Sequence, residues 1–260
     1  MREYANETIK VIEERSSVRR FVPDSITEEE RKIITSAAIR APNGGRMSKF
    51  TLIDVRDPIL KKTLSKTCDN QPFIATAPGV YAVMSDFRRW FRLFNMYVKT
   101  SSTKLNHPRE DEIILCAIDA LLAAQNMVIA AESLGIGSCY IADMIINYQK
   151  HKQLFRLPQY VMPITLVVFG RRPPEMEAKL TPRIDISVVH RDYYRDPTDE
   201  ELRRMVVPLL GKDRNGNVVT TVEEYVYRWY LRRLGGALSF DRANNVREMF
   251  NDWLKDPYEG

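Results

Sequence analysis

The longest apolar stretch of this 260-residue chain runs from Ile113 to Leu134 and is rich in alanine. It is apolar around most of its helical circumference, which favours burial against more than one layer. Gly135 follows directly and is a suitable helix C-cap. We expect no membrane span, because polar side chains leave no charge-free run of about 18 residues: Asp119, Gln125, Asn126 and Glu132. The sequence therefore predicts that residues 113–134 form the longest helix of the chain.

Capping signals and periodicity predict further elements on both sides of that helix. Thr27 with Glu30 forms a capping box, and Asp57-Pro58 is typical of a helix start. We expect helices over 5–14, from Thr27 to the break at Ala41, and over 58–67, 86–98, 198–210, 221–234 and 241–254, with a loop over 99–112. Strands are expected over 50–55 and 80–84, and central strands over 139–142 and 163–169. This order predicts an α+β domain over 1–197 and a helical C-terminal extension over 198–260 packed on the same domain.

The charge balance and the cysteine count narrow the class of protein. The net charge is +5, yet residues 198–260 hold 10 Lys and Arg against 11 Asp and Glu, so the basic excess lies in residues 1–197. Such an excess fits a pocket for a phosphate-bearing small molecule at least as well as a nucleic-acid groove. Cys68, Cys116 and Cys139 have no CxxC spacing, and the three histidines are scattered, so we expect no disulfide or metal site. The N-terminus lacks the apolar core of a signal peptide, and we expect a cytoplasmic location.

Two basic segments are candidate binding sites. Arg15, Ser16, Ser17 and Arg19 offer guanidinium forks and hydroxyls that suit a phosphate dianion, and a solvated basic turn is the alternative. In the helix over 86–98, arginines interleave with aromatic residues. That pattern fits base stacking or, more commonly, a half-buried amphipathic helix. The residues in question are Arg88, Arg89, Trp90, Arg92 and Phe94.

The order of several segments resembles the FMN-dependent nitroreductase family, especially its oxygen-insensitive nitroreductases and NAD(P)H:flavin reductases. Arg15 to Arg19 resembles the family's R-x-S-x-R opening, and Ala41-Pro-Asn-Gly-Gly-Arg-Met-Ser48 resembles its A-P-S-x-x-N-x-Q loop. The stretch from Asp119 to Ala142 is close to the family's most recognisable segment. Other matching segments are Gln71 to Pro78, Phe169-Gly170, Pro182-Arg183, and His190 with Tyr194. The resemblance covers about residues 5–195.

The resemblance implies a nitroreductase-like fold with a mostly antiparallel central sheet, in a domain-swapped homodimer with one FMN at each inter-subunit site. It implies that Arg15, Ser16, Ser17 and Arg19 hold the FMN phosphate and ribityl chain, joined by Arg183 and by Lys179. Asn43, Gly45 and Arg46 would reach the flavin from the partner subunit. Gln71 would bond the isoalloxazine edge, and Tyr140, Ile141 and Ala142 would line the ring.

The same resemblance implies an oxidoreductase that passes electrons from NAD(P)H through FMN to a nitroaromatic, a quinone or a flavin. We expect Arg88, Arg89, Trp90, Arg92 and Phe94 to lie on the substrate side. Arg46, Ser48 and Thr181 depart from the family pattern. An altered flavin chemistry, such as reductive dehalogenation or flavin fragmentation, is therefore an alternative. A non-enzymatic basic binding module is a further one.

Overall fold

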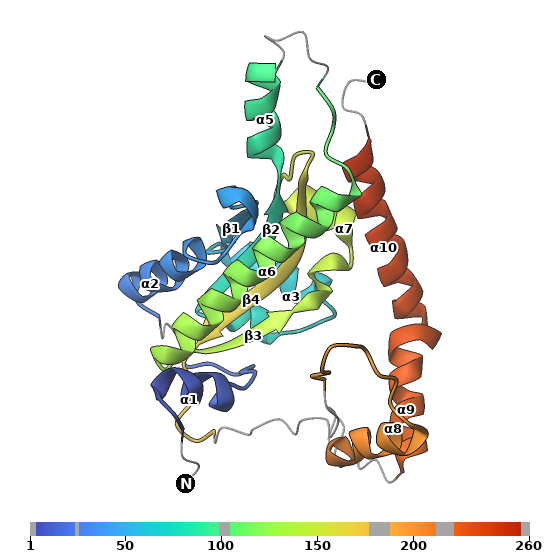
Figure 1. Cartoon of the computed structure of the whole chain (residues 1–260). Coiled ribbons are helices and arrows are strands. Elements are labelled where there is room, and N and C mark those ends of the chain that lie inside the picture. The colour runs from blue at the N-terminus through green and yellow to red at the C-terminus, as the bar shows by residue number, and fades with distance from the viewer. Residues whose placement is uncertain (1–3, 24–25, 99–104, 177–187, 212–220, 256–260) are drawn as a thin grey trace. The chain divides into compact units, whose positions relative to one another are not determined.

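An antiparallel four-stranded sheet forms the centre of the computed structural model, which describes residues 4–23, 26–98, 105–176, 188–211 and 221–255 (Figure 1). The strands are β1 (Phe50–Asp54), β2 (Gly79–Asp86), β3 (Gly137–Ile141) and β4 (Val161–Gly170), in the order β1-β2-β4-β3. The expected α+β class and antiparallel sheet are confirmed. The expectation that residues 139–142 form a central strand is wrong, because β3 is the last strand of the sheet. Most of its residues are nevertheless buried, and on its outer side Ser17 forms an isolated bridge to Ser138.

The long helix α6 (Glu110–Ser133) crosses one face of the sheet beside α2 (Glu28–Ile39) (Figure 1). Four of its alanines are fully buried in the core cluster that also contains the strand residues Tyr81 and Val167: Ala120, Ala123, Ala124 and Ala131. It begins three residues before the expected start, inside the predicted loop, because Glu110, Asp111 and Glu112 complement the positive end of the helix dipole. By length and composition α6 could cross a membrane, although a single helix of this kind is weak evidence for a span, and 44% of its most apolar window is buried inside the protein.

The opposite face of the sheet packs on α3 (Pro58–Thr67) and α4 (Phe73–Thr76). The sequence did not predict α4, the 3-10 turn η3 (Ala142–Ile145) or α7 (Tyr148–Leu154), because these elements are too short for an apolar period to develop. The N-terminal helix α1 (Glu7–Glu14), the 3-10 turn η1 (Gly44–Arg46) and α5 (Arg88–Tyr97) complete this part of the fold.

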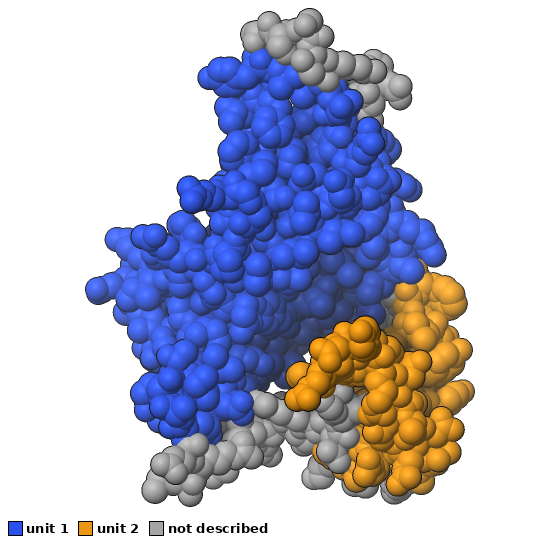
Figure 2. All heavy atoms as spheres, in the orientation of Figure 1, with its two compact units in different colours: residues 1–178, 242–260 blue, residues 179–241 orange. Residues whose placement is uncertain are grey.

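The chain separates into two compact units (Figure 2): residues 1–178 with 242–260, and residues 179–241. The second unit contains α8 (Asp199–Val206), the 3-10 turn η4 (Val207–Leu209), α9 (Val222–Tyr230) and the π-helical turn η5 (Leu231–Gly235). Helix α10 (Ala237–Leu254) spans the division. Its end belongs to the first unit, where Met249 and Trp253 are buried among Phe91, Tyr148 and Tyr160. The chain thus passes from the first unit to the second after residue 178 and returns to the first unit after residue 241. The sequence suggested a single boundary, after residue 197.

Candidate functional site

The segment that follows α1 lies along the outer edge of β3. Ser17 bridges to Ser138, and the backbone N–H of Val18 donates to the carbonyl of Ser138 at 2.8 Å. A Cβ on Gly137 would overlap the Val18 side chain, so the glycine lets the two backbones approach. The predicted phosphate segment is therefore held beside the predicted ring-lining residues Tyr140, Ile141 and Ala142.

Guanidinium and hydroxyl groups gather at this edge. The Arg19 guanidinium and the Ser17 hydroxyl lie close enough to the Cys139 thiol to oppose the rise in its pKa, which burial causes. Arg172 donates to the Oγ of the buried Ser16 at 2.9 Å. Arg15 and Arg172 line a hollow of about 480 Å³ beside the end of α6. The structure thus brings Arg15, Ser16, Ser17 and Arg19 together and adds Arg172.

Acidic and phenolic groups border this cluster. Glu132 lines the same hollow and accepts a hydrogen bond of 3.0 Å from the Ser138 hydroxyl; burial raises the pKa of its carboxyl. Burial also raises the pKa of Tyr140 to about 12, and the nearby Arg15 acts against that rise. Tyr140 therefore stays a neutral phenol at ordinary pH, and its hydroxyl donates to Gln125 at 3.2 Å.

Gln71 joins the site through a contact that the sequence did not predict. Its amide nitrogen Nε2 donates to the Cys68 carbonyl at 2.8 Å and to Asp143 Oδ2 at 3.0 Å. Asp143 directly follows Ala142, so Gln71 is tied to the end of β3. Arg242 Nη2 lies 4.0 Å from the other Asp143 oxygen. Because both of these partners only accept, they fix which end of the amide is the nitrogen, and the Gln71 oxygen accepts no hydrogen bond from the residues that the structure describes.

The loop that contains Asn43, Gly45 and Arg46 lies elsewhere in the chain. The buried Asp119 of α6 accepts from the backbone nitrogens of Gly44 and Lys49, both at 3.1 Å. Arg46 and Ser48 hold positive φ angles of 60° and 46° in this loop. The hollow beside Arg15 reaches Glu132, thirteen residues further along α6 and so about 20 Å away along the axis. One chain therefore does not bring this loop together with the arginine cluster.

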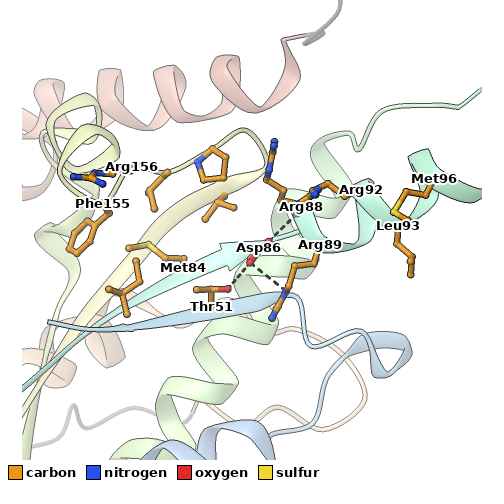
Figure 3. A pocket seen from close by; sticks show the side chains of 14 residues that line it. Thr51, Met84, Asp86, Arg88, Arg89, Arg92, Leu93, Met96, Phe155 and Arg156 are labelled. Carbon is orange, nitrogen blue, oxygen red and sulfur yellow. Dashed lines mark hydrogen bonds and ion pairs between the residues drawn. The ribbon is translucent and has the colours of Figure 1, made fainter.

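Helix α5 turns its predicted substrate-side residues to two different faces. The Trp90 indole donates to the Met47 carbonyl at 2.7 Å, and Phe94 packs on Phe87 and Trp90. The arginines point the other way and line a separate cavity (Figure 3): Arg88, Arg89 and Arg92. The aromatic side chains and the arginines of α5 thus have different surroundings, and the placement of both sets on the substrate side stays a prediction.

Two predicted phosphate ligands, Lys179 and Arg183, fall outside the described residues, as does Thr181. Sequence reasoning missed Arg172 and Asp143. Arg172 could have been proposed from the sequence, because Arg171-Arg172 directly follows the strand β4, which is a neighbour of β3. Asp143 gave no signal of its own, because its partner Gln71 is 72 residues distant in the chain.

The chain is similar in sequence and in fold to known oxidoreductases. The model of the nitroreductase family matches residues 12–171, more than half of the chain. An FMN reductase [NAD(P)H] of Bacillus subtilis is 30% identical over 233 residues, covering 87% of this chain and 92% of the relative. An oxygen-insensitive NADPH nitroreductase of Salmonella typhimurium is 27% identical, covering 75% and 77%. The solved structure of the hypothetical oxidoreductase YcnD from Bacillus subtilis superposes with a TM-score of 0.79 at 26% identity, covering 95% and 97%.

Proposed function

The chain belongs to the nitroreductase family, and we propose that it binds FMN between two copies of itself and reduces small electron-poor molecules. It is a flavin-dependent oxidoreductase that uses NAD(P)H, as its relatives are named. The observation that carries the proposal is the combination of the family match with the cluster of guanidinium and hydroxyl groups on the edge of β3.

The donors at this edge fit FMN. Arg15, Arg19 and Arg172 supply the charge that a phosphate dianion requires, and the neighbouring serines supply hydroxyl donors. Gln71 offers a free oxygen, which suits the N–H of an isoalloxazine edge. When bound, FMN would supply the two-electron redox chemistry that links NAD(P)H to the acceptor. The chain itself binds and orients the ring; Lys179 and Arg183 remain proposed phosphate ligands.

The separation of the two groups of site residues supports a site shared between subunits. Asn43, Gly45 and Arg46 lie about 20 Å along α6 from the arginine cluster of the same chain. A second copy can supply this loop to the cluster, as the resemblance implies. The residues that would complete the site are then Asn43, Gly45 and Arg46 of the partner subunit.

An apolar face of α6 supports the homodimer. Ile114, Leu115, Ile118, Leu121 and Leu122 share the side of the helix turned away from the sheet, and each is between 38% and 58% exposed. An unpartnered apolar stripe of this length is typical of a protein interface. We therefore propose a homodimer that buries it. The buried free thiols Cys68, Cys116 and Cys139 agree with a cytoplasmic location.

Absorbance and turnover test the function. Purified protein should show flavin bands near about 370 and 450 nm and should oxidise NAD(P)H in the presence of a quinone, nitroaromatic or flavin. A panel of these acceptors, assayed with NADH and with NADPH, identifies the preferred pair. Protein that folds without binding FMN would contradict the proposal.

A further inference from the structure

A cavity of about 520 Å³ opens where β2 runs into α5, on the face of the sheet opposite α6 (Figure 3). Thr51, Met84 and Asp86 project into it from β1 and β2, while α5 and residues 155–158 form its walls. Its volume lies in the range of small-molecule sites, roughly 300–1,000 Å³.

Three guanidinium groups around this cavity have no side-chain hydrogen bond or ion pair with any residue that the structure describes: Arg88, Arg92 and Arg156. Arg89 differs, because its Nη2 donates to the carbonyls of Ser48 and Phe50 at 2.8 and 2.6 Å. The cavity therefore holds positive charge that the protein does not use for its own structure.

The single carboxylate in the lining is already occupied. Asp86 accepts from the Thr51 hydroxyl at 2.5 Å and from the backbone nitrogen of Arg88 at 3.0 Å, and it pairs with Arg89 Nε at 3.5 Å. These donors balance the charge of Asp86. The three remaining guanidiniums are left to attract an anion.

The rest of the lining is apolar. Ile53 and Met84 come from the strands, Leu93 and Met96 from α5, and Phe155 and Leu157 from the segment after α7. A ligand that fills the cavity must therefore have an apolar body, and only its end can carry charge. Inorganic phosphate alone would leave these side chains uncovered.

The backbone at Arg156 adds a local observation. Arg156 is a non-glycine residue with a φ of 51°, held by hydrogen bonds from its own N–H to Gln153 and from Leu157 to Lys152, at 3.1 and 2.9 Å. These two bonds form a Schellman motif, in which a left-handed residue directly after the C-cap ends a helix, here α7. The turn fixes the backbone of Arg156 at the end of α7, where its side chain lines the cavity.

We propose that this cavity is a second ligand site, which binds a small organic anion with one terminal carboxylate, sulfonate or phosphate group on an apolar body. The site is distinct from the arginine cluster on β3. It lies on β1, on β2 and on the Val161 end of β4, whereas β3 pairs with β4 only from Leu166 to Gly170, about 17 Å further along that strand. The inference goes beyond the proposed function and does not require the flavin.

Calorimetric titration of the FMN-loaded protein with naphthalene-2-sulfonate tests the site, with neutral 2-naphthol as the comparison ligand. We expect the sulfonate to bind at least about tenfold more tightly than the naphthol, because one charge-assisted contact is worth about that factor. Arg92→Gln and Arg156→Gln should each weaken sulfonate binding about tenfold. Arg40→Gln, an exposed arginine at the end of α2, should leave it unchanged.

Further arms exclude a folding artefact and identify the source of the anion. Each variant is first checked for an unchanged melting temperature, and Leu93→Trp, at a 41% exposed cavity position, should block the site by filling it. If NADPH or FMN displaces the sulfonate, the natural ligand carries a nucleotide phosphate. If only benzoate displaces it, the natural ligand carries a carboxylate. Both outcomes support the site. No sulfonate binding, equal binding of 2-naphthol, or equal affinity in Arg92→Gln and Arg40→Gln would overturn it.

Discussion

At the scale of single residues, Arg19 and Arg20 form a matched pair for testing the phosphate site. Arg19 lies against Cys139 on β3, whereas Arg20 pairs with Glu175 at 3.3 Å. Arg19→Ala should weaken FMN binding roughly tenfold or more, because it removes a charge-assisted contact. Arg20→Ala should change the affinity little. Fluorescence titration of the flavin-free protein measures both, and equal affinities would remove Arg19 from the site.

Asp143 gives a second prediction, as a positioning residue for Gln71. Its carboxylate fixes the amide so that the Gln71 oxygen is free to accept from the N3–H of the flavin. Asp143→Asn lets the amide reverse and should weaken FMN binding about fivefold, within the range for one hydrogen bond. Wild-type protein should also discriminate against N3-methyl FMN, and the variant should lose much of that discrimination. If the discrimination is unchanged, Asp143 does not orient Gln71.

The site residues that the sequence could propose are those whose chemistry is contained in one segment. Arg15 to Arg19 carries its charges and hydroxyls within five positions, and the structure places it beside Ser138 of β3. Arg172 and Asp143 could not be found in this way. Each contributes through a partner more than 70 residues away in the chain, and only the folded sheet brings those partners together.

At the scale of elements, Asp119 couples the loop after α2 to the long helix. It is 3% exposed and accepts from two backbone nitrogens of that loop. Asp119→Ala leaves both donors without a partner and should lower the free energy of unfolding by about 3 kcal/mol. Asp111→Ala, exposed in the first turn of the same helix, should cost less than about 1 kcal/mol. Urea denaturation compares them, and similar losses would show that Asp119 does not anchor the loop.

His151 joins α3 to η3 and provides a pH-dependent prediction. The imidazole is fully buried, with Nδ1 2.8 Å from the Met144 carbonyl and Nε2 2.8 Å from the Thr67 hydroxyl. Burial lowers the pKa of His151 below its ordinary value of 6.5. As the pH falls, the imidazole is therefore protonated in the unfolded chain before it is protonated in the folded protein. The stability that the neutral ring provides is present above pH 6.5 and is lost as the pH falls below that value.

The measurement is the urea midpoint at pH 7 and at pH 5. One such group can contribute no more than about 1.4 kcal/mol for each pH unit. His151→Gln should be less stable at pH 7 and should lose less stability on acidification than the wild type. The carboxylates of Glu30 and Asp252 each have a pKa of about 2, so they titrate below the range from pH 7 to pH 5. Parallel losses in both proteins would show that His151 is not the responsible group.

Element prediction succeeded where a segment was long and capped, and failed where it was short. The capping boxes at Thr27 and Thr198 mark the starts of α2 and α8 as expected. The seven residues of α7 follow Asn147, whose φ is 61°, and carry no apolar period. Helix α5 shows a different limit. Its arginines and aromatic residues are interleaved in the sequence, and a period of 3.6 residues turns them to different faces, but the sequence does not show what each face contacts.

At the scale of the whole molecule, the sequence predicted the class of fold but not how its parts are grouped. The alanine-rich segment was correctly expected to be the longest helix, because its apolar pattern persists for more than six turns. The grouping depends instead on side chains near the end of the chain. Met249 and Trp253 enter the aromatic cluster of the first unit, although they lie more than 60 residues beyond its other part. The sequence pattern around Met249 and Trp253 does not indicate which part of the chain they contact.

The proposed dimer gives the last prediction. Helix α6 is buried on the side that faces the sheet and exposes Ile114, Ile118 and Leu121 on the other, at 58%, 46% and 47%. Leu121→Glu places a charge in the proposed interface, where it would be buried without a partner, and should shift the protein from dimer to monomer in sedimentation velocity at micromolar concentration. Because the site needs the partner's loop, the same variant should lose most of its FMN. Ile59→Glu, on α3 at 75% exposure and on the opposite face of the sheet, should stay dimeric and flavin-loaded. A wild-type monomer that retains FMN would contradict both the dimer and the shared site.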